Sequence, residues 1–118
     1  MKKFSIIIPV YNVEQYLKRT LDSVFKQTYQ NFEVIVVNDG CTDKSMDIAR
    51  KYDVKIIDTT HVGVSEARNI GVTYARGEYL LFLDSDDYWD IKLLESIQQS
   101  IKNRPDVIRF QVRNVYDD

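Results

Sequence analysis

The sequence predicts a three-layer α/β fold, with helices on both faces of a mostly parallel, Rossmann-like sheet. Short apolar runs rich in β-branched residues alternate with segments of helical periodicity along the chain. This is the pattern of parallel strands joined by right-handed helical crossovers. The chain has 118 residues, of which 44% are hydrophobic and 29% are charged. This size and composition predict one globular domain with its own core and exclude a disordered chain.

The expected strands are short, apolar and bounded by turn-forming residues: they cover residues 4–8, 32–37, 54–57, 79–83 and 107–112. Pro9 is expected to end the first strand, since proline cannot donate a hydrogen bond to a neighbouring strand. Lys55 interrupts the third, which is typical of an edge strand with one face in water. The fourth has no polar residue inside it, so it is expected to be central and buried on both faces.

The expected helices each carry apolar residues at helical spacing along one face. Residues that can cap the first, second and fourth helices are Asn12, Thr42 or Asp43, and Asp90. The third helix covers residues 65–76, with Ala67, Ile70 and Tyr74 on one side. Gly77 follows it, where a residue in the left-handed conformation commonly ends a helix.

The strand order 3-2-1-4 fits these expectations, because it places the third strand at an edge. In that order the winding of the chain reverses between the first and fourth strands. Ligands of open α/β sheets bind at such a reversal, beyond the carboxyl ends of the strands. The residues that end the first, second and fourth strands are therefore the candidates for function.

Several carboxylates follow the fourth strand, in the segment Asp84-Ser85-Asp86-Asp87. If this segment is extended, Asp84 and Asp86 point the same way. Converging carboxylates repel each other unless a cation or a shared proton relieves them. Oxygen ligands with room for water suit Mg²⁺ or Mn²⁺, which usually bind together with substrate phosphates. The alternative is an Asp-rich turn that caps the following helix at Asp87 or Asp90.

Three further residues are candidates for binding a nucleotide. Tyr11 either belongs to the core or offers a ring for base stacking at the end of the first strand. Asp39 either forms an ordinary Asp-Gly turn or accepts a hydrogen bond from a ring N–H of a nucleobase. Arg68 lies near the start of the third helix, where the helix N-terminus and the guanidinium both attract phosphate. Its alternative role is that of a solvated surface residue.

Charge and composition argue against several other classes of protein. A net charge of -2 and a pI near 5.4 argue against a nucleic-acid-binding protein with a basic surface. The chain has one cysteine, Cys41, and one histidine, His61, which exclude an internal disulfide and a histidine-rich metal site. Neither has a visible partner for nucleophilic catalysis. No apolar run is long enough to span a membrane, so a cytoplasmic chain is expected.

Four motifs together resemble family 2 glycosyltransferases, enzymes of the GT-A fold that use nucleotide-diphosphate sugars. In chain order they are Pro9-Val10-Tyr11-Asn12, Val37-Asn38-Asp39-Gly40-Cys41-Thr42-Asp43, Gly63-Val64-Ser65-Glu66-Ala67-Arg68-Asn69-Ile70-Gly71 and Leu83-Asp84-Ser85-Asp86-Asp87. The resemblance extends from about Phe4 to Trp89, in the family's order and spacing. Two positions depart from the family pattern: Cys41 replaces a serine, and His61 stands where an asparagine is common.

The resemblance implies inverting transfer of a sugar to an acceptor hydroxyl from a nucleotide-diphosphate sugar, with uracil the usual base. By analogy Tyr11 stacks on the base, and Asp39 bonds the base N–H. Asp86 would hold a divalent metal ion, Mg²⁺ or Mn²⁺, that bridges the two phosphates. The residues that the resemblance assigns to donor binding are Pro9, Val10, Tyr11, Asp39, Arg68, Asp84 and Ser85.

The same resemblance places the general base, and most of the acceptor site, beyond a point corresponding to Asp118. Residues 1–118 are therefore expected to be the nucleotide-sugar-binding portion of a larger enzyme. The expected acceptor is a saccharide or a lipid-linked molecule. Family members often work at the cytoplasmic face of the inner membrane, and any membrane association is expected through parts outside this chain.

Three alternative functions remain open at this point. The chain could be a nucleotide-binding module that is catalytically incomplete. A haloacid-dehalogenase-like phosphatase also places Asp-x-Asp after an apolar strand, but Tyr88 stands where that family expects a small residue. A response-regulator receiver would need an acidic pair after the first strand, where this chain has Tyr11 and Asn12.

If Asp39 binds a nucleobase, its replacement by alanine is expected to weaken nucleotide binding with little loss of stability.

Overall fold

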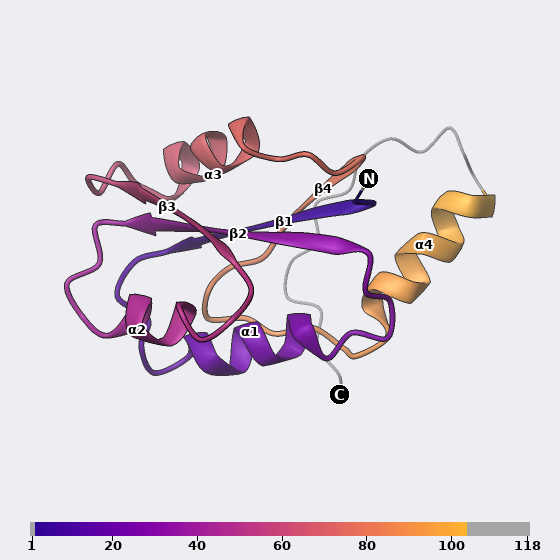
Figure 1. The fold of residues 1–118 in the computed structure, drawn as a ribbon, viewed down its shortest axis with the longest axis horizontal. Coiled ribbons are helices and arrows are strands. Elements are labelled where there is room, and N and C mark those ends of the chain that lie inside the picture. The colour runs from indigo at the N-terminus through magenta and orange to yellow at the C-terminus, as the bar shows by residue number, and fades with distance from the viewer. Residues whose placement is uncertain (1, 104–118) are drawn as a thin grey trace.

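A computed structural model describes residues 2–103 of the chain (Figure 1). Strands and helices alternate in the order β1 (Phe4–Val10), α1 (Leu17–Phe25), β2 (Phe32–Asp39), α2 (Ser45–Ala49), β3 (Lys55–Thr59), α3 (Val64–Thr73), β4 (Tyr79–Phe82) and α4 (Leu93–Asn103). The predicted alternation of strands and helices is therefore confirmed. The strand expected at residues 107–112 lies outside the described residues.

The strands form one parallel sheet in the order β3-β2-β1-β4. β1 pairs with β2 on one side, from Phe4 opposite Phe32 to Val10 opposite Asn38. On its other side β1 pairs with β4 as far as Ile7. Figure 1 shows α3 on one face of the sheet and α1 and α2 on the other, so the fold has three layers. The predicted fold class and the strand order 3-2-1-4 are confirmed.

Both faces of the central strand β1 are buried, as expected for a strand inside a parallel sheet. Ile6 and Ile8 belong to the larger core cluster, which also includes residues of α1, α2 and α4. Ile7 points to the opposite face and joins a smaller cluster with Ala67 of α3. Gly71 lets α3 lie close to the sheet, because a Cβ atom there would stand 2.6 Å from Ile7 Cγ2.

Pro9 was expected to end the first strand, and this prediction is wrong. β1 continues through Pro9 to Val10. The Leu83 N–H donates to the Ile7 carbonyl, so the polar backbone groups of Ile7 face β4. Residues two apart in a strand face the same way, and Pro9 therefore also faces that side. β4 ends at Phe82, so β4 has no carbonyl that requires an N–H from Pro9. The proline thus fits inside the strand.

β4 was predicted to be a central strand buried on both faces, and this prediction is wrong for the described residues. β4 lies at one edge of the sheet, and only Leu81 among its residues is fully buried. An apolar run alone does not distinguish an edge strand from a central one, because burial also depends on what covers its free side. The predicted edge position of β3 at the opposite end of the sheet is confirmed.

Two expectations about the third helix are also wrong. Tyr74, expected on the same side as Ala67 and Ile70, follows the last helical residue and is 42% exposed. Gly77 is not a left-handed helix stop, because α3 already ends at Thr73. Gly77 instead lies against the backbone of β1, as a Cβ atom there would stand 2.7 Å from the Phe4 carbonyl carbon.

Candidate functional site

A pocket of about 240 Å³ lies at the carboxyl ends of β1 and β2. Its lining comes from four separate parts of the chain and consists of Pro9, Val10, Tyr11, Asp39, His61, Gly63, Val64 and Ser85. This is the place where the winding of the chain reverses between β1 and β4, the usual ligand site of such sheets. A hollow of about 450 Å³ lies around Phe32, at the start of β2, and contains none of the motif residues.

The pocket brings together five of the residues that the sequence analysis selected, namely Pro9, Val10, Tyr11, Asp39 and Ser85. The other three, Arg68, Asp84 and Asp86, do not line it. Asp84 and Asp86 flank Ser85, however, so they belong to the segment that forms one wall. His61 also lines the pocket, although it was not among the residues selected from the sequence. Its position in the sequence, between an expected edge strand and the motif that begins at Gly63, could have indicated that His61 lies near the site.

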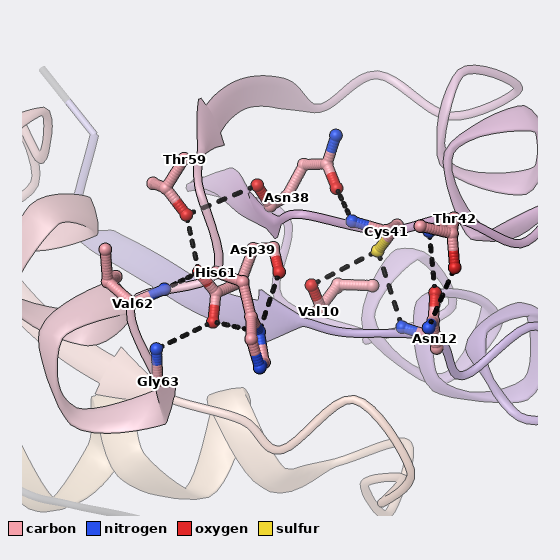
Figure 2. A network of polar contacts seen from close by, with 10 residues as sticks. All are labelled: Val10, Asn12, Asn38, Asp39, Cys41, Thr42, Thr59, His61, Val62 and Gly63. Carbon is pink, nitrogen blue, oxygen red and sulfur yellow. Dashed lines mark hydrogen bonds and ion pairs between the residues drawn. The ribbon is translucent and has the colours of Figure 1, made fainter.

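Asp39 organises the loop between β3 and α3 (Figure 2). Its Oδ1 accepts hydrogen bonds from the Thr59 hydroxyl at 2.6 Å and the Val62 N–H at 2.7 Å. Its Oδ2 accepts a hydrogen bond from the Gly63 N–H at 3.0 Å. Asp39 is only 3% exposed. Burial raises the pKa of this carboxyl, but the hydrogen bonds outweigh it and hold the pKa below its ordinary value. Asp39 is therefore a buried, charged carboxylate that fixes the loop wall of the pocket.

Tyr11 and His61 form a stacked pair of rings at the mouth of the pocket. Their ring centroids are 4.0 Å apart, with an angle of 26° between the planes. Tyr11 is 45% exposed, so it is not a core residue. The Nδ1 atom of His61 lies 3.3 Å from the Asp39 carbonyl oxygen and 3.5 Å from Asp39 Oδ2. His61 thus touches both of the residues that the sequence analysis assigned to a nucleobase.

Hydrogen bonds join the loop after β1 to the loop after β2 (Figure 2). The Asn12 Oδ1 accepts a hydrogen bond from the Thr42 N–H at 2.8 Å, and the Cys41 thiol donates to the Val10 carbonyl at 3.3 Å. Burial raises the pKa of the Cys41 thiol, which keeps it neutral and able to donate. Asn12 was expected to cap α1, but the residue at that position is Tyr16, without a side-chain cap.

The segment from Asp84 to Asp87 is a turn and not the extended segment that the sequence analysis assumed. The Asp87 N–H donates to the Asp84 carbonyl at 3.0 Å, which closes the turn. The Asp84 carboxylate pairs with Arg68 Nη2 at 2.7 Å, so its charge is compensated within the protein. Asp86 is exposed. Within residues 2–103 no group of three or more histidine, cysteine, aspartate or glutamate side chains is placed to hold a metal ion.

Side chains of helix α1 donate hydrogen bonds to the backbone carbonyl oxygens of this turn. The Thr20 hydroxyl, which is fully buried, lies 2.8 Å from the Ser85 carbonyl oxygen and 2.5 Å from that of Asp87. Arg19 Nη2 donates to the Asp86 carbonyl at 3.0 Å. Three successive carbonyl groups of the turn are thus held by one turn of α1.

Replacing Thr20 by valine is expected to lower the free energy of unfolding by about 1–2 kcal/mol. Valine has nearly the same shape but leaves the buried carbonyl groups of Ser85 and Asp87 without this donor. Thr20→Ser keeps the hydroxyl and should retain most of the stability. Urea denaturation of the three proteins measures the difference. Equal stability of Thr20→Val and the unchanged protein would show that the hydroxyl does not hold the turn.

Comparison with known proteins identifies the family of this chain. The model of Glycosyl transferase family 2 matches residues 5–118. The chain belongs to this family. It is 41% identical over 104 residues to glycosyltransferase GlyA of Streptococcus pneumoniae, an alignment that covers 84% of this chain and 15% of GlyA. The chain thus spans only a small part of the length of that relative.

Solved structures of other proteins share the fold of this chain. The crystal structure of S. aureus TarS 1-349 in complex with UDP-GlcNAc superposes with a TM-score of 0.83 at 36% identity, covering 87% of this chain and 32% of that TarS chain. A mannosyltransferase from Pyrobaculum calidifontis, in complex with GDP-Man and Mn²⁺, gives a TM-score of 0.69 at 26% identity, with 74% and 28% covered. The GT-A fold is therefore confirmed. No helix among residues 2–103 is long and apolar enough to cross a membrane.

Proposed function

We propose that residues 1–118 are the nucleotide-sugar-binding portion of a family 2 glycosyltransferase, and that the pocket beside Tyr11 receives the nucleobase of the donor. The observation that carries this proposal is that Tyr11, Asp39 and Ser85 come from three distant segments and line one pocket. In this proposal Tyr11 stacks on the base, while Pro9 and Val10 form the wall beside it. Asp39 accepts the base N–H through Oδ2, which accepts a hydrogen bond from Gly63 alone, whereas Oδ1 accepts hydrogen bonds from both Thr59 and Val62.

A uridine diphosphate sugar is the donor that we favour. The similar TarS structure contains UDP-GlcNAc, and a uracil ring carries the N–H that a carboxylate at Asp39 would accept. Asp84 would contact the ribose or the sugar, with its orientation set by Arg68 at 2.7 Å. The Arg68 Nε atom is buried without a hydrogen-bond partner, so Arg68 still has an N–H to offer to a bound nucleotide. The acceptor would be the hydroxyl of a saccharide or a lipid-linked molecule, with the transfer inverting and cytoplasmic.

A divalent metal ion, Mg²⁺ or Mn²⁺, fits this site through Asp86. These ions are commonly held by one or two protein carboxylates together with substrate phosphates and water, not by a full protein cage. Asp86 is exposed beside the pocket-lining Ser85, and Arg19 fixes the backbone that carries it. A mannosyltransferase of similar fold contains Mn²⁺. When bound, the ion would stabilise the negative charge of the departing diphosphate.

Titration of the protein with uridine diphosphate, with and without Mn²⁺, tests this proposal. We expect Mn²⁺ to raise the affinity about tenfold or more, because a cation between Asp86 and the phosphates relieves their repulsion. Asp86→Asn should abolish the effect of Mn²⁺. Asp47→Asn, which removes an exposed carboxylate on α2, should leave that effect intact. If calorimetry detects no binding of uridine diphosphate, the proposal is overturned. If the affinity is the same with and without Mn²⁺, Asp86 does not hold a metal ion.

Donor hydrolysis tests the alternative of a catalytically incomplete binding module. Because the resemblance to the family places the general base beyond a point corresponding to Asp118, we expect residues 1–118 to bind uridine diphosphate without appreciable hydrolysis of a uridine diphosphate sugar. Rapid hydrolysis by these residues alone would instead place the catalytic group within them.

A further inference from the structure

The imidazole of His61 lies where the proposed function requires a nucleobase. It is a flat aromatic ring stacked on Tyr11, with centroids 4.0 Å apart. Its Nδ1 atom faces two oxygens of Asp39, at 3.3 and 3.5 Å. Both oxygens are acceptors, so the neutral ring would place its proton on Nδ1. A ring N–H directed at Asp39 is the feature that a bound base would present.

The two rings leave no space for a third ring between them. The ring centroids of aromatic pairs lie roughly 4.5–7 Å apart, so a base inserted between Tyr11 and His61 would need about twice the present centroid distance of 4.0 Å. A base that stacks on this face of Tyr11 must therefore move the imidazole away.

The hydrogen bonds of Asp39 lead to the same conclusion. An ionised carboxylate has about four acceptor positions. Thr59, Val62 and Gly63 fill three of them. The position that remains is on Oδ2, the oxygen 3.5 Å from His61. His61 therefore occupies both the ring face and the acceptor that the base would use.

We propose that His61 occupies the nucleobase subsite in the free protein and that a bound base displaces it, so that His61 sets the affinity for the nucleotide. This inference rests on the proposed function. The side chain of His61 is 55% exposed, so it can turn toward solvent without opening the core. Its backbone has a φ of 66° and is held by Gly40, where a Cβ atom would stand 3.0 Å from His61 Cβ. The displacement would therefore be a rotation of the side chain and not a movement of the loop.

Three substitutions at position 61 distinguish the effect of the ring on nucleotide affinity from the effect of the backbone conformation. Asparagine and glycine both adopt a positive φ readily, so His61→Asn and His61→Gly remove the ring with little backbone strain. His61→Phe keeps a stacking ring. We expect about threefold or higher affinity for uridine diphosphate in the asparagine and glycine variants, and no such gain in the phenylalanine variant, because stacking must be broken before the base binds. Affinity for pyrophosphate, which has no base, should not change, and thermal melting checks that each variant is folded.

Proton NMR observes the displacement directly, because His61 is the only histidine in the chain. Stacking on Tyr11 should shift its imidazole resonances upfield through the ring current, and Tyr11→Ala supplies the unstacked reference. Uridine diphosphate should move the resonances toward that reference.

The outcomes distinguish this inference from the function on which it rests. If the unchanged protein binds uridine diphosphate and neither His61→Gly nor His61→Asn binds it more tightly, the displacement of His61 is overturned and the proposed function stands. A gain in the asparagine variant alone would also overturn it, since the amide would then be adding a contact. If uridine diphosphate does not bind the unchanged protein at all, both proposals fall.

Discussion

Replacing Asp39 by alanine is expected to lower the free energy of unfolding by about 3 kcal/mol. The side chain is buried and accepts hydrogen bonds from Thr59, Val62 and Gly63. Removing it leaves these donors without a partner, and each unsatisfied buried group costs roughly 1–3 kcal/mol. From the sequence, little loss of stability was expected if Asp39 binds a base, and a large loss was expected only for the Asp-Gly turn alternative. The structure instead makes Asp39 the support of the whole loop before α3.

The pH dependence of stability provides an independent measurement of the same prediction. The pKa of Asp39 is lowered in the folded protein, so the unfolded chain binds its proton more readily. The stabilisation that Asp39 supplies is therefore complete above the unfolded pKa of about 3.9 and is lost as pH falls through the lower folded value. The difference in stability between the unchanged protein and Asp39→Ala should be constant near pH 7 and shrink below about pH 4.

Asp39→Asn is the matched control, since it keeps the shape and one acceptor oxygen while removing the charge. Urea denaturation should place its stability between those of the unchanged protein and Asp39→Ala. A stability of Asp39→Ala within about 0.5 kcal/mol of the unchanged protein, the range of an ordinary surface substitution, would contradict this account. The hydrogen bonds of Asp39 would then not hold the loop before α3.

Replacing Gly77 by alanine is expected to destabilise the fold by about 3 kcal/mol, near the upper end of what overpacking of a core costs. The added Cβ atom would stand 2.7 Å from the carbonyl carbon of Phe4 and from the nitrogen of Ser5. These are backbone atoms of the central strand, and they cannot rotate away as a side chain could. β4 would have to move away from β1 at the start of their pairing.

The same substitution would disturb a hydrogen-bond chain at the start of β4. The Gly77 N–H donates to the Ser5 hydroxyl at 2.7 Å, and that hydroxyl donates to Glu33 Oε2 at 2.5 Å. The Arg76 N–H donates to the same oxygen of Glu33 at 2.6 Å. Burial raises the pKa of Glu33, and these hydrogen bonds outweigh it and lower the pKa overall. A shift of β4 would weaken this network as well as the strand pairing.

Glu78→Ala is the matched control for Gly77→Ala, because the neighbouring residue is exposed and makes one ion pair with Lys3 at 3.6 Å. Its effect should stay within about 0.5 kcal/mol. Thermal melting of the two variants side by side measures the contrast. Equal melting temperatures for both would mean that β4 adjusts to the alanine at no cost. The close approach of Gly77 to β1 would then not be required for stability.

The sequence alone predicted the strand order and which strand ends form the candidate site. Strands and helices follow from apolar periodicity, which is a local property of the chain, and the parallel connections then leave few possible topologies. For the same reason Tyr11 and Asp39 could be selected before their positions in space were known, whereas the roles of Pro9, Val10 and Ser85 came from the resemblance to family 2 glycosyltransferases. Their arrangement around one pocket follows from the topology, because the carboxyl ends of parallel strands lie at one edge of a sheet.

The tertiary structure decided what each of these residues contacts. The turn at Asp84 depends on Thr20, which is 65 residues away from Ser85 in the sequence, and the loop around Asp39 depends on Val62, 23 residues later. The position of His61 on Tyr11 is set by two loops that meet only in the folded chain. Periodicity reports which side of an element is buried, but a hydrogen bond or a stacked ring depends on a partner that another segment brings. The partners of Asp39, Gly77 and His61 could therefore be found only in the folded chain.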